Sequence, residues 1–285
     1  MFKNILIPIS SEFYQKEIFQ TGAFLAEKFD STIKLIYIIE GKTLDQTEKR
    51  LDSYRTDFDR AETKKEIIRR HIHVADTIIF EDAKRLFADK NIPFNGEVIE
   101  GEFSTVIKGQ LNKYKYDLIL MGFEKECLLH YRLFEEVDIP IWVESGTDEK
   151  SILAVCSNLA PNQKVPEMSL RLSKTLGWDL HMVYVVDIQD AVEVDGNGKR
   201  SEKKSENALL ERGQQFISEM EKKGIDVTLV KGSLEKETAK AAEDIGAGLV
   251  ILGREQKKKS ILGIPVKGMK RKMAETCKYS ILFVN

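Results

Sequence analysis

Two short runs of apolar residues, each ended by a glycine, constrain the fold of this chain more than any other feature. They are Leu118–Gly122 and Leu249–Gly253, and they lie 131 residues apart. An apolar run of this length that stops at a turn residue indicates a strand covered on both faces, as in a parallel sheet. A buried helical segment has the same pattern, but a glycine after so few residues favours the strand. Glycine also lets a ligand approach the carboxyl end of the strand, where ligands bind in open α/β sheets.

The similarity between the two halves of the chain extends well beyond these runs. Leu35–Glu40 matches Met182–Asp187 at an offset of 147 residues, and further matches connect the start and the end of each half. The change of offset from 147 to 131 means that the first half carries 16 extra residues after its second strand. A repeat of this length in a chain of 285 residues predicts two tandem α/β domains, at residues 1–146 and 150–285.

Composition and charge limit the classes of protein to which the chain can belong. Hydrophobic residues make up 42% of the sequence, and no apolar run approaches the roughly 20 residues of a membrane span. The first residues read directly as a strand and do not resemble a signal peptide. The three cysteines lack metal-ligand spacing, so we expect reduced thiols and a cytoplasmic protein. Because no apolar run is long enough to span a bilayer, we expect no contact with a membrane. The net charge is −6 over residues 1–150 but +4 over residues 151–285, which favours the second half for binding an anion.

A long charged segment interrupts the first half at about residues 41–92. Its apolar residues have helical spacing and predict two helices, separated at His71 and His73. Mixed charge of this kind is typical of a solvated helix, and the alternative is a dimer contact or a surface for a protein partner. Two histidines two residues apart do not share a helical face, so the pair does not indicate a metal site.

The segment after Gly253 is the most distinctive part of the second half. Residues 254–278 include nine basic and two acidic residues, and we expect Gly268 to open a helix. Backbone N–H groups, a helix N-terminus and neutralising charge are what a phosphate group needs, so the segment is a candidate anion site. A solvated basic loop is the alternative. In the first half only 16 residues separate Gly122 from Ile139, without a second glycine, so no phosphate cradle is expected there.

Several of these motifs resemble those of the universal stress protein family. They are Ile-Leu-Ile-Pro-Ile at residues 5–9, Leu-Ile-Leu-Met-Gly at 118–122, Ile-Pro-Ile-Trp-Val at 139–143 and Tyr-Val-Val-Asp at 184–187. The resemblance covers essentially the whole chain as two such domains. It implies two tandem five-stranded parallel-sheet domains with the Rossmann-like α/β fold of the adenine-nucleotide alpha-hydrolases. It also implies that the two domains pair as an internal pseudo-dimer.

The resemblance further implies a nucleotide site in the second domain. ATP binders of the family carry an aspartate after the first strand and a Gly-x-x-Gly-(nine residues)-Gly-Ser/Thr loop after the fourth. Here Ser157 replaces the aspartate, Gln256 the second glycine and Met269 the final hydroxyl residue, while Gly253 matches the first glycine. If ATP with Mg²⁺ or another phosphorylated ligand binds, Ser157 and Val186 would lie near the ribose and base. The phosphates would be held by Arg254, Lys257, Lys258, Lys259, Lys267 and Gly268.

Three functions remain open on the sequence alone. They are a regulatory or stress-response protein that binds ATP or another phosphorylated ligand, a protein-interaction module without nucleotide, and a slow ATP hydrolase. No Ser-His-Asp, Cys-His or paired-carboxylate arrangement stands out, so binding is favoured over catalysis. Cys156 reads as a small buried hydrophobic residue, not a reactive thiol. The basic cluster at 254–272 lacks interleaved aromatic residues, so nucleic acid is not an expected partner.

Overall fold

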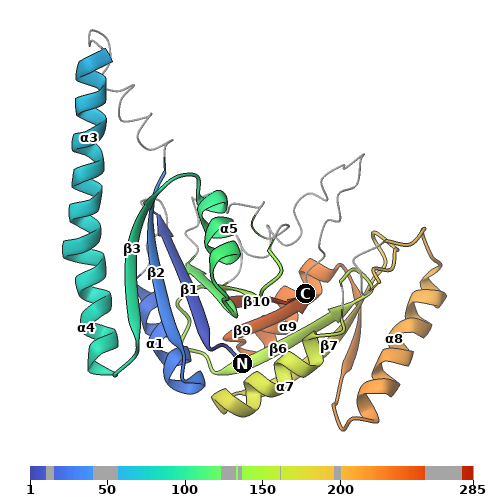
Figure 1. The fold of residues 1–285 in the computed structure, drawn as a ribbon. Coiled ribbons are helices and arrows are strands. Elements are labelled where there is room, and N and C mark those ends of the chain that lie inside the picture. Colours follow the sequence, from blue (N-terminus) through green and yellow to red (C-terminus); the bar gives the residue numbers. More distant parts are fainter. Residues whose placement is uncertain are drawn as a thin grey trace. The chain divides into compact units, whose positions relative to one another are not determined.

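The structure, a computed structural model, contains two compact units, Met1–His130 and Tyr131–Asn285. It describes residues 1–10, 16–40, 57–122, 133, 137–160, 162–195, 200–253 and 278–284, with the backbone alone described at 57–61, 63, 64 and 76. In each unit, strands alternate with helices (Figure 1). This alternation is what the glycine-ended apolar runs predict for a mostly parallel α/β fold.

The first unit is built around a parallel sheet. Its elements are β1 (Asn4–Ser10), α1 (Glu17–Phe29), β2 (Thr32–Ile39), α3 (Asp57–Val74), η1 (Ala75–Phe80), α4 (Glu81–Asp89), β3 (Phe94–Glu100), α5 (Phe103–Lys113) and β4 (Leu118–Gly122). The four strands lie in the order β3-β2-β1-β4. Neighbouring strands of this kind need a helical crossover between them, and the helices supply it.

The second unit has the same strand order in four of its strands and two strands more. Its elements are β5 (Ile141–Glu144), β6 (Ser151–Ser157), α7 (Val165–Leu176), β7 (Asp179–Asp187), α8 (Glu206–Glu221), β8 (Thr228–Gly232), α9 (Leu234–Ile245), β9 (Leu249–Gly253) and β10 (Ser280–Val284). The order is β5-β10-β9-β6-β7-β8, and all pairs are parallel except β5 with β10.

Strand β5 belongs to the first repeat of the sequence but lies in the second unit. It pairs antiparallel with β10, the last strand of the second repeat. The boundary predicted at residues 146–150 separates the repeats along the chain, whereas the division by spatial contact falls at His130. The two differ because β5 packs with the strand that ends the other repeat.

The register of the strands follows the alignment of the two repeats. In the first unit Tyr37 lies opposite Val98, and in the second unit Tyr184 lies opposite Leu229. These pairs are separated by the same offsets, 147 and 131, that relate the two halves of the sequence. Tyr37 and Tyr184 therefore occupy equivalent positions in the two sheets.

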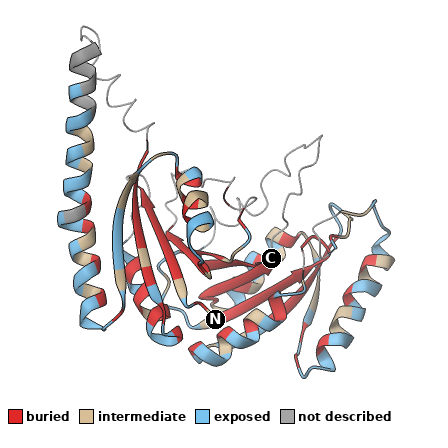
Figure 2. Ribbon diagram, in the orientation of Figure 1, coloured by how far each residue is buried: buried red, intermediate tan, exposed pale blue. Residues whose placement is uncertain are grey.

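The core of each unit is formed by its central strands. Every residue of β4 and β9 is buried, which confirms the prediction that these two runs are strands covered on both faces. Figure 2 shows the same burial along the central strands, while the helices are buried along one side and exposed along the other. Burial of this apolar surface is the main source of stability in such a fold.

The helical insertion differs from the prediction at one point. The predicted break at His71 and His73 is absent, because α3 continues to Val74 and is followed directly by the π-helical turn η1 and by α4. Figure 1 shows the three as one continuous column beside β3. The wider π turn rotates the following helix without interrupting it. His71 shares a hydrogen bond of 3.2 Å with the Tyr37 hydroxyl, so this part of α3 docks on β2.

Candidate functional site at the carboxyl ends of the strands

The carboxyl ends of three parallel strands meet at one edge of the sheet of the second unit. Strand β6 lies between β9 and β7, and Ser157 at its end lies opposite Val185. Neighbouring strands lie about 4.8 Å apart. The structure therefore brings together three of the residues predicted from the sequence, Gly253, Ser157 and Val186. We refer to these strand ends as the carboxyl edge.

Ser157 is held by a set of short local hydrogen bonds. Its hydroxyl oxygen accepts from the Leu159 N–H at 3.1 Å. Its own N–H donates to Asn162 Oδ1 at 3.0 Å, and its carbonyl accepts from Asn162 Nδ2 at 2.9 Å. These bonds fold the chain back on itself directly after β6, as serine and asparagine side chains commonly do in turns. The serine hydroxyl retains one proton that it can donate.

A buried network joins Asn158 and Asp187 at the same edge. The Asn158 side chain donates to the carbonyls of Asp187 and Val192 at 3.0 and 2.7 Å, and it accepts from the Asp187 N–H at 2.7 Å. The Asp187 carboxylate accepts from the N–H groups of Gln189 and Leu234 at 2.9 and 2.7 Å. Because Leu234 begins α9, Asp187 caps that helix from a neighbouring strand. Neither role was predicted; the only sequence signal is the place of both residues directly at a strand end.

The predicted site residues fall into two groups, those that are buried and those that lie outside the described residues. Ser157 and Val186 are 0% exposed, and Gly253 is buried at the end of β9. The predicted phosphate contacts lie outside the described residues; they are Arg254, Lys257, Lys258, Lys259, Lys267 and Gly268. Contact of these residues with a phosphate group stays a prediction.

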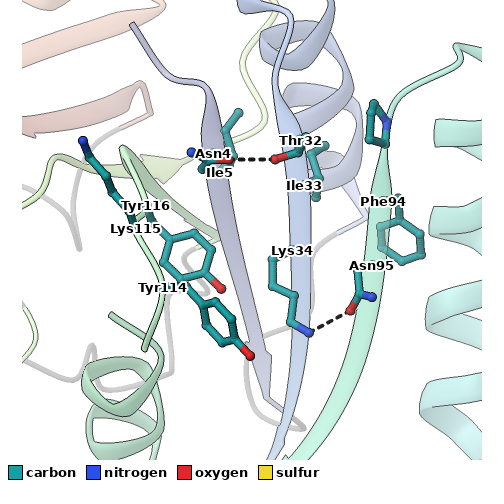
Figure 3. A pocket seen from close by; sticks show the side chains of 11 residues that line it. Asn4, Ile5, Thr32, Ile33, Lys34, Phe94, Asn95, Tyr114, Lys115 and Tyr116 are labelled. Atoms are coloured by element: carbon teal, nitrogen blue, oxygen red, sulfur yellow. Dashed lines mark hydrogen bonds between the residues drawn. The ribbon is translucent and has the colours of Figure 1, made fainter. Parts of the chain in front are cut away.

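The first unit has a hollow at the opposite end of its strands. Figure 3 shows this hollow, about 490 Å³ in volume, where β1, β2 and β3 begin. Lys34 Nζ donates to Asn95 Oδ1 at 2.7 Å, and Thr32 donates to Asn4 at 2.9 Å. Burial, with nearby tyrosine and glutamate groups, raises the pKa of Tyr116 to about 12, so this phenol stays neutral. The hollow lies at the amino ends of parallel strands, whereas ligands in such folds bind at the carboxyl ends.

The described residues contain few groups suited to catalysis or metal binding. Burial raises the pKa of the Cys156 thiol, and this side chain is 0% exposed, as expected for a small hydrophobic residue in a core. Over the described ranges, no three His, Cys, Asp or Glu side chains gather as metal ligands. Within the same ranges, no helix has the length and apolar character needed to cross a membrane.

Solved structures place the chain in a class of Rossmann-like α/β proteins. A putative universal stress protein from Pseudomonas aeruginosa UCBPP-PA14 is 12% identical with a TM-score of 0.65, over 99% of this chain and 93% of that chain. A universal stress protein from Archaeoglobus fulgidus DSM 4304 is 15% identical with a TM-score of 0.60, over 98% of both chains. At these identities the similarity shows the fold, here along the whole chain.

The sequence itself identifies the family of the first repeat. Residues 1–138 match the model of the universal stress protein family. The first repeat is therefore a universal stress protein domain, and the resemblance inferred from its motifs is confirmed. None of the curated protein sequences matches the chain.

Proposed function

We propose that the protein is a cytoplasmic regulatory or stress-response protein that binds one phosphorylated ligand in its second repeat. The leading candidate for this ligand is ATP with Mg²⁺. The observation that carries the proposal is the position of Gly253. This residue ends β9 beside the end of β6, and it leads into residues 254–278, nine of which are basic. A cationic segment that follows a glycine at the carboxyl end of a parallel strand suits a phosphate group.

The two repeats differ in the properties that a phosphorylated ligand requires. The first repeat has the equivalent strand, β4, but residues 1–150 carry a net charge of −6, against +4 for residues 151–285. Only 16 residues follow Gly122 before Ile139, and none of them is glycine. Anion binding is therefore expected in the second repeat alone.

Thermal unfolding with and without Mg-ATP tests this proposal. Ligand at 100 times its dissociation constant stabilises a folded protein by about 2.7 kcal/mol, which corresponds to a rise of roughly 5–10 °C in Tm for a domain near this size. We expect this rise in the wild type. It should be lost in Gly268→Val and in the triple variant with Lys257, Lys258 and Lys259 changed to Gln.

A control with two other lysines replaced separates a binding site from general electrostatic attraction. Lys236 and Lys240 lie exposed on α9 of the same unit, and their replacement by Gln should leave the Mg-ATP shift unchanged. A wild type whose Tm does not respond to Mg-ATP would contradict nucleotide binding. A shift lost equally in the control variant would contradict the assignment to the segment after Gly253.

A second candidate function is a protein-interaction module without nucleotide. It is favoured by the carboxyl edge, where Asn158 and Asp187 are 2% exposed and bind to the protein's own backbone. It is also favoured by the helical insertion, where Val74 and Ile78, four residues apart, are 40% and 52% exposed. Exposed apolar side chains on neighbouring turns suit a contact with another copy of the chain.

Sedimentation velocity over a range of concentrations distinguishes this second candidate. The second candidate predicts a dimer that dissociates in the variant Ile78→Glu. The control variant Arg69→Glu, at an exposed polar position of α3, should leave the dimer intact. A monomer at every concentration would exclude this contact between copies.

A further inference from the structure

The second unit contains a cavity of about 910 Å³ between α7 and α8. It extends from Ser157 at the carboxyl edge to Ile225, which lies before β8, so it follows the two helices away from the carboxyl edge. Figure 1 shows α8 standing apart from α7 along this length. Sites for small molecules in proteins have volumes of about 300–1,000 Å³, so the cavity is large enough for one.

The cavity arises from a difference between the two repeats. In the first unit, α1 and α4 pack together through Phe19 and Phe87, whose ring centroids are 6.1 Å apart. The position 147 residues after Phe19 holds Pro166, which lines the cavity. The side chain of proline is shorter than that of phenylalanine, so it does not reach across to the facing helix. The space between the helices is therefore specified by the sequence of the second repeat.

Tyr184 places a hydroxyl group in the wall of the cavity. Its side chain is only 2% exposed, and its hydroxyl makes no hydrogen bond to any residue within the described ranges. Its equivalent in the first repeat, Tyr37, bonds to His71 instead. Burial raises the pKa of Tyr184, so the hydroxyl remains a neutral donor. Because this hydroxyl lines the cavity and can donate into it, the group is suited to a ligand that accepts a hydrogen bond.

Aromatic and aliphatic side chains form one wall of the cavity, and part of its charged rim is internally paired. The rings of Tyr184 and Phe216 lie 5.0 Å apart at 38°, and Leu170 faces the same space from α7. At the rim, Arg212 pairs with Glu193 at 3.0 Å, and Lys204 pairs with the same carboxylate. Aromatic walls favour an aromatic ligand, and charges already paired within the protein favour an uncharged one.

We propose that this cavity binds a small, uncharged aromatic compound with a carbonyl oxygen that accepts a hydrogen bond from Tyr184. The aromatic part of the ligand packs against Phe216 and Leu170. This site is additional to the proposed phosphate site, and it does not depend on whether nucleotide binds.

Fluorescence titration with prodan, a neutral naphthalene ketone, tests the proposal in the full-length protein. Prodan emission moves to shorter wavelength in an apolar site, so saturable binding with such a shift is expected. Tyr184→Phe removes the donor but keeps the ring, and it should weaken binding about three- to tenfold, the value of one hydrogen bond. Bound prodan should then emit at still shorter wavelength, because its carbonyl has lost the hydrogen bond.

Two further variants complete the test. Leu170→Trp fills the cavity from a side chain that is 43% exposed, so it should fold and should weaken binding more than tenfold. Tyr37→Phe, the same change at the equivalent position of the first repeat, should leave prodan binding unaltered. The inference is overturned if the wild type shows no saturable binding, or if wild type, Tyr184→Phe and Leu170→Trp bind equally. Displacement of prodan by Mg-ATP would also overturn it, by assigning the cavity to nucleotide.

Discussion

At the scale of single residues, polar side chains at the carboxyl edge organise the protein's own backbone. The Asp187 carboxylate uses both oxygens, one for the N–H of Gln189 and the other for the N–H of Leu234. An asparagine at this position would place its NH₂ group against one of these donors. We expect Asp187→Asn to lower the free energy of unfolding by about 1–3 kcal/mol, measured by urea unfolding at pH 7.

The matched control for this change lies on the same strand. Asp179 is exposed at the start of β7, so Asp179→Asn should change the free energy of unfolding by less than about 0.5 kcal/mol. If Asp187→Asn were as stable as the control variant, the capping role of Asp187 would be wrong.

Glu102 makes a contribution to the free energy of unfolding that depends on pH. Burial opposes ionisation of this carboxyl, but hydrogen bonds from Thr105 and Ser104 outweigh it and hold the pKa at about 2, below the usual 4.5. A carboxylate with a lowered pKa stabilises the fold above its unfolded pKa, and this contribution is lost as pH falls toward 2.

Glu102→Gln tests this contribution at the N-terminus of α5. The variant should be less stable than the wild type by about 1 kcal/mol at pH 7, and the difference should shrink as pH falls from about 5 toward 2. Urea unfolding at pH 7 and pH 3 measures it. A difference between the two proteins that is the same at both values of pH would rule out the carboxylate as its source.

The sequence predicts which residues lie at the carboxyl edge better than it predicts what they do. Gly253 was placed there because an apolar run ends at it, and Ser157 because the family resemblance puts it at the position of the aspartate after the first strand. The role of Asn158 was not predictable, since it contacts carbonyl groups 29 and 34 residues away. Spacing along the chain carries no information about such a contact; only the parallel pairing of β6 with β7 creates it.

At the scale of elements, the helix pairs of the two units differ in how tightly they pack. Phe87 on α4 is 0% exposed and contacts the rings of Phe19 and Phe94. Phe87→Ala should therefore cost about 3–5 kcal/mol. Phe216 on α8 borders the cavity, so Phe216→Ala should cost only about 1–2 kcal/mol. Chemical unfolding of both variants measures the difference, and equal losses would contradict the looser packing of α8.

The turn into β9 requires a residue without a side chain. A Cβ atom at Gly248 would lie 1.9 Å from the carbonyl oxygen of Glu149, a backbone atom that cannot move aside cheaply. We expect Gly248→Ala to lower the free energy of unfolding by at least about 2 kcal/mol. Gly109 in α5 has open space at this position, so Gly109→Ala should raise it by about 0.5–1 kcal/mol. Circular dichroism melts compare the two variants, and a neutral Gly248→Ala would contradict the close approach.

The bounds of elements were predictable where apolar runs are continuous and less so where they are not. Strands β4 and β9 match their predicted residues, because a buried strand is uniformly apolar. In the helical insertion, the two histidines suggested a break that the structure replaces with the π turn η1. Helical periodicity shifts at a π turn as it does at a break, so the sequence pattern alone does not distinguish them.

At the scale of the whole molecule, one repeated fold carries two different sets of residues. The repeat, the parallel strands and the family were all accessible from the sequence, since they depend on patterns that recur along the chain. The pairing of β5 with β10 and the cavity beside α7 were not, because each depends on contacts between distant segments. The proposed division of function follows the charge of the two halves, with the ligand in the second.

Hydrogen–deuterium exchange of the full-length protein with and without Mg-ATP tests this division most directly, because it reports on both repeats in one experiment. We predict slower exchange on addition of Mg-ATP in peptides covering residues 151–160 and 249–270, and no change in peptides covering residues 1–122. Slower exchange at the ends of β1 and β4 instead, or no change in any peptide, would contradict a phosphorylated ligand in the second repeat.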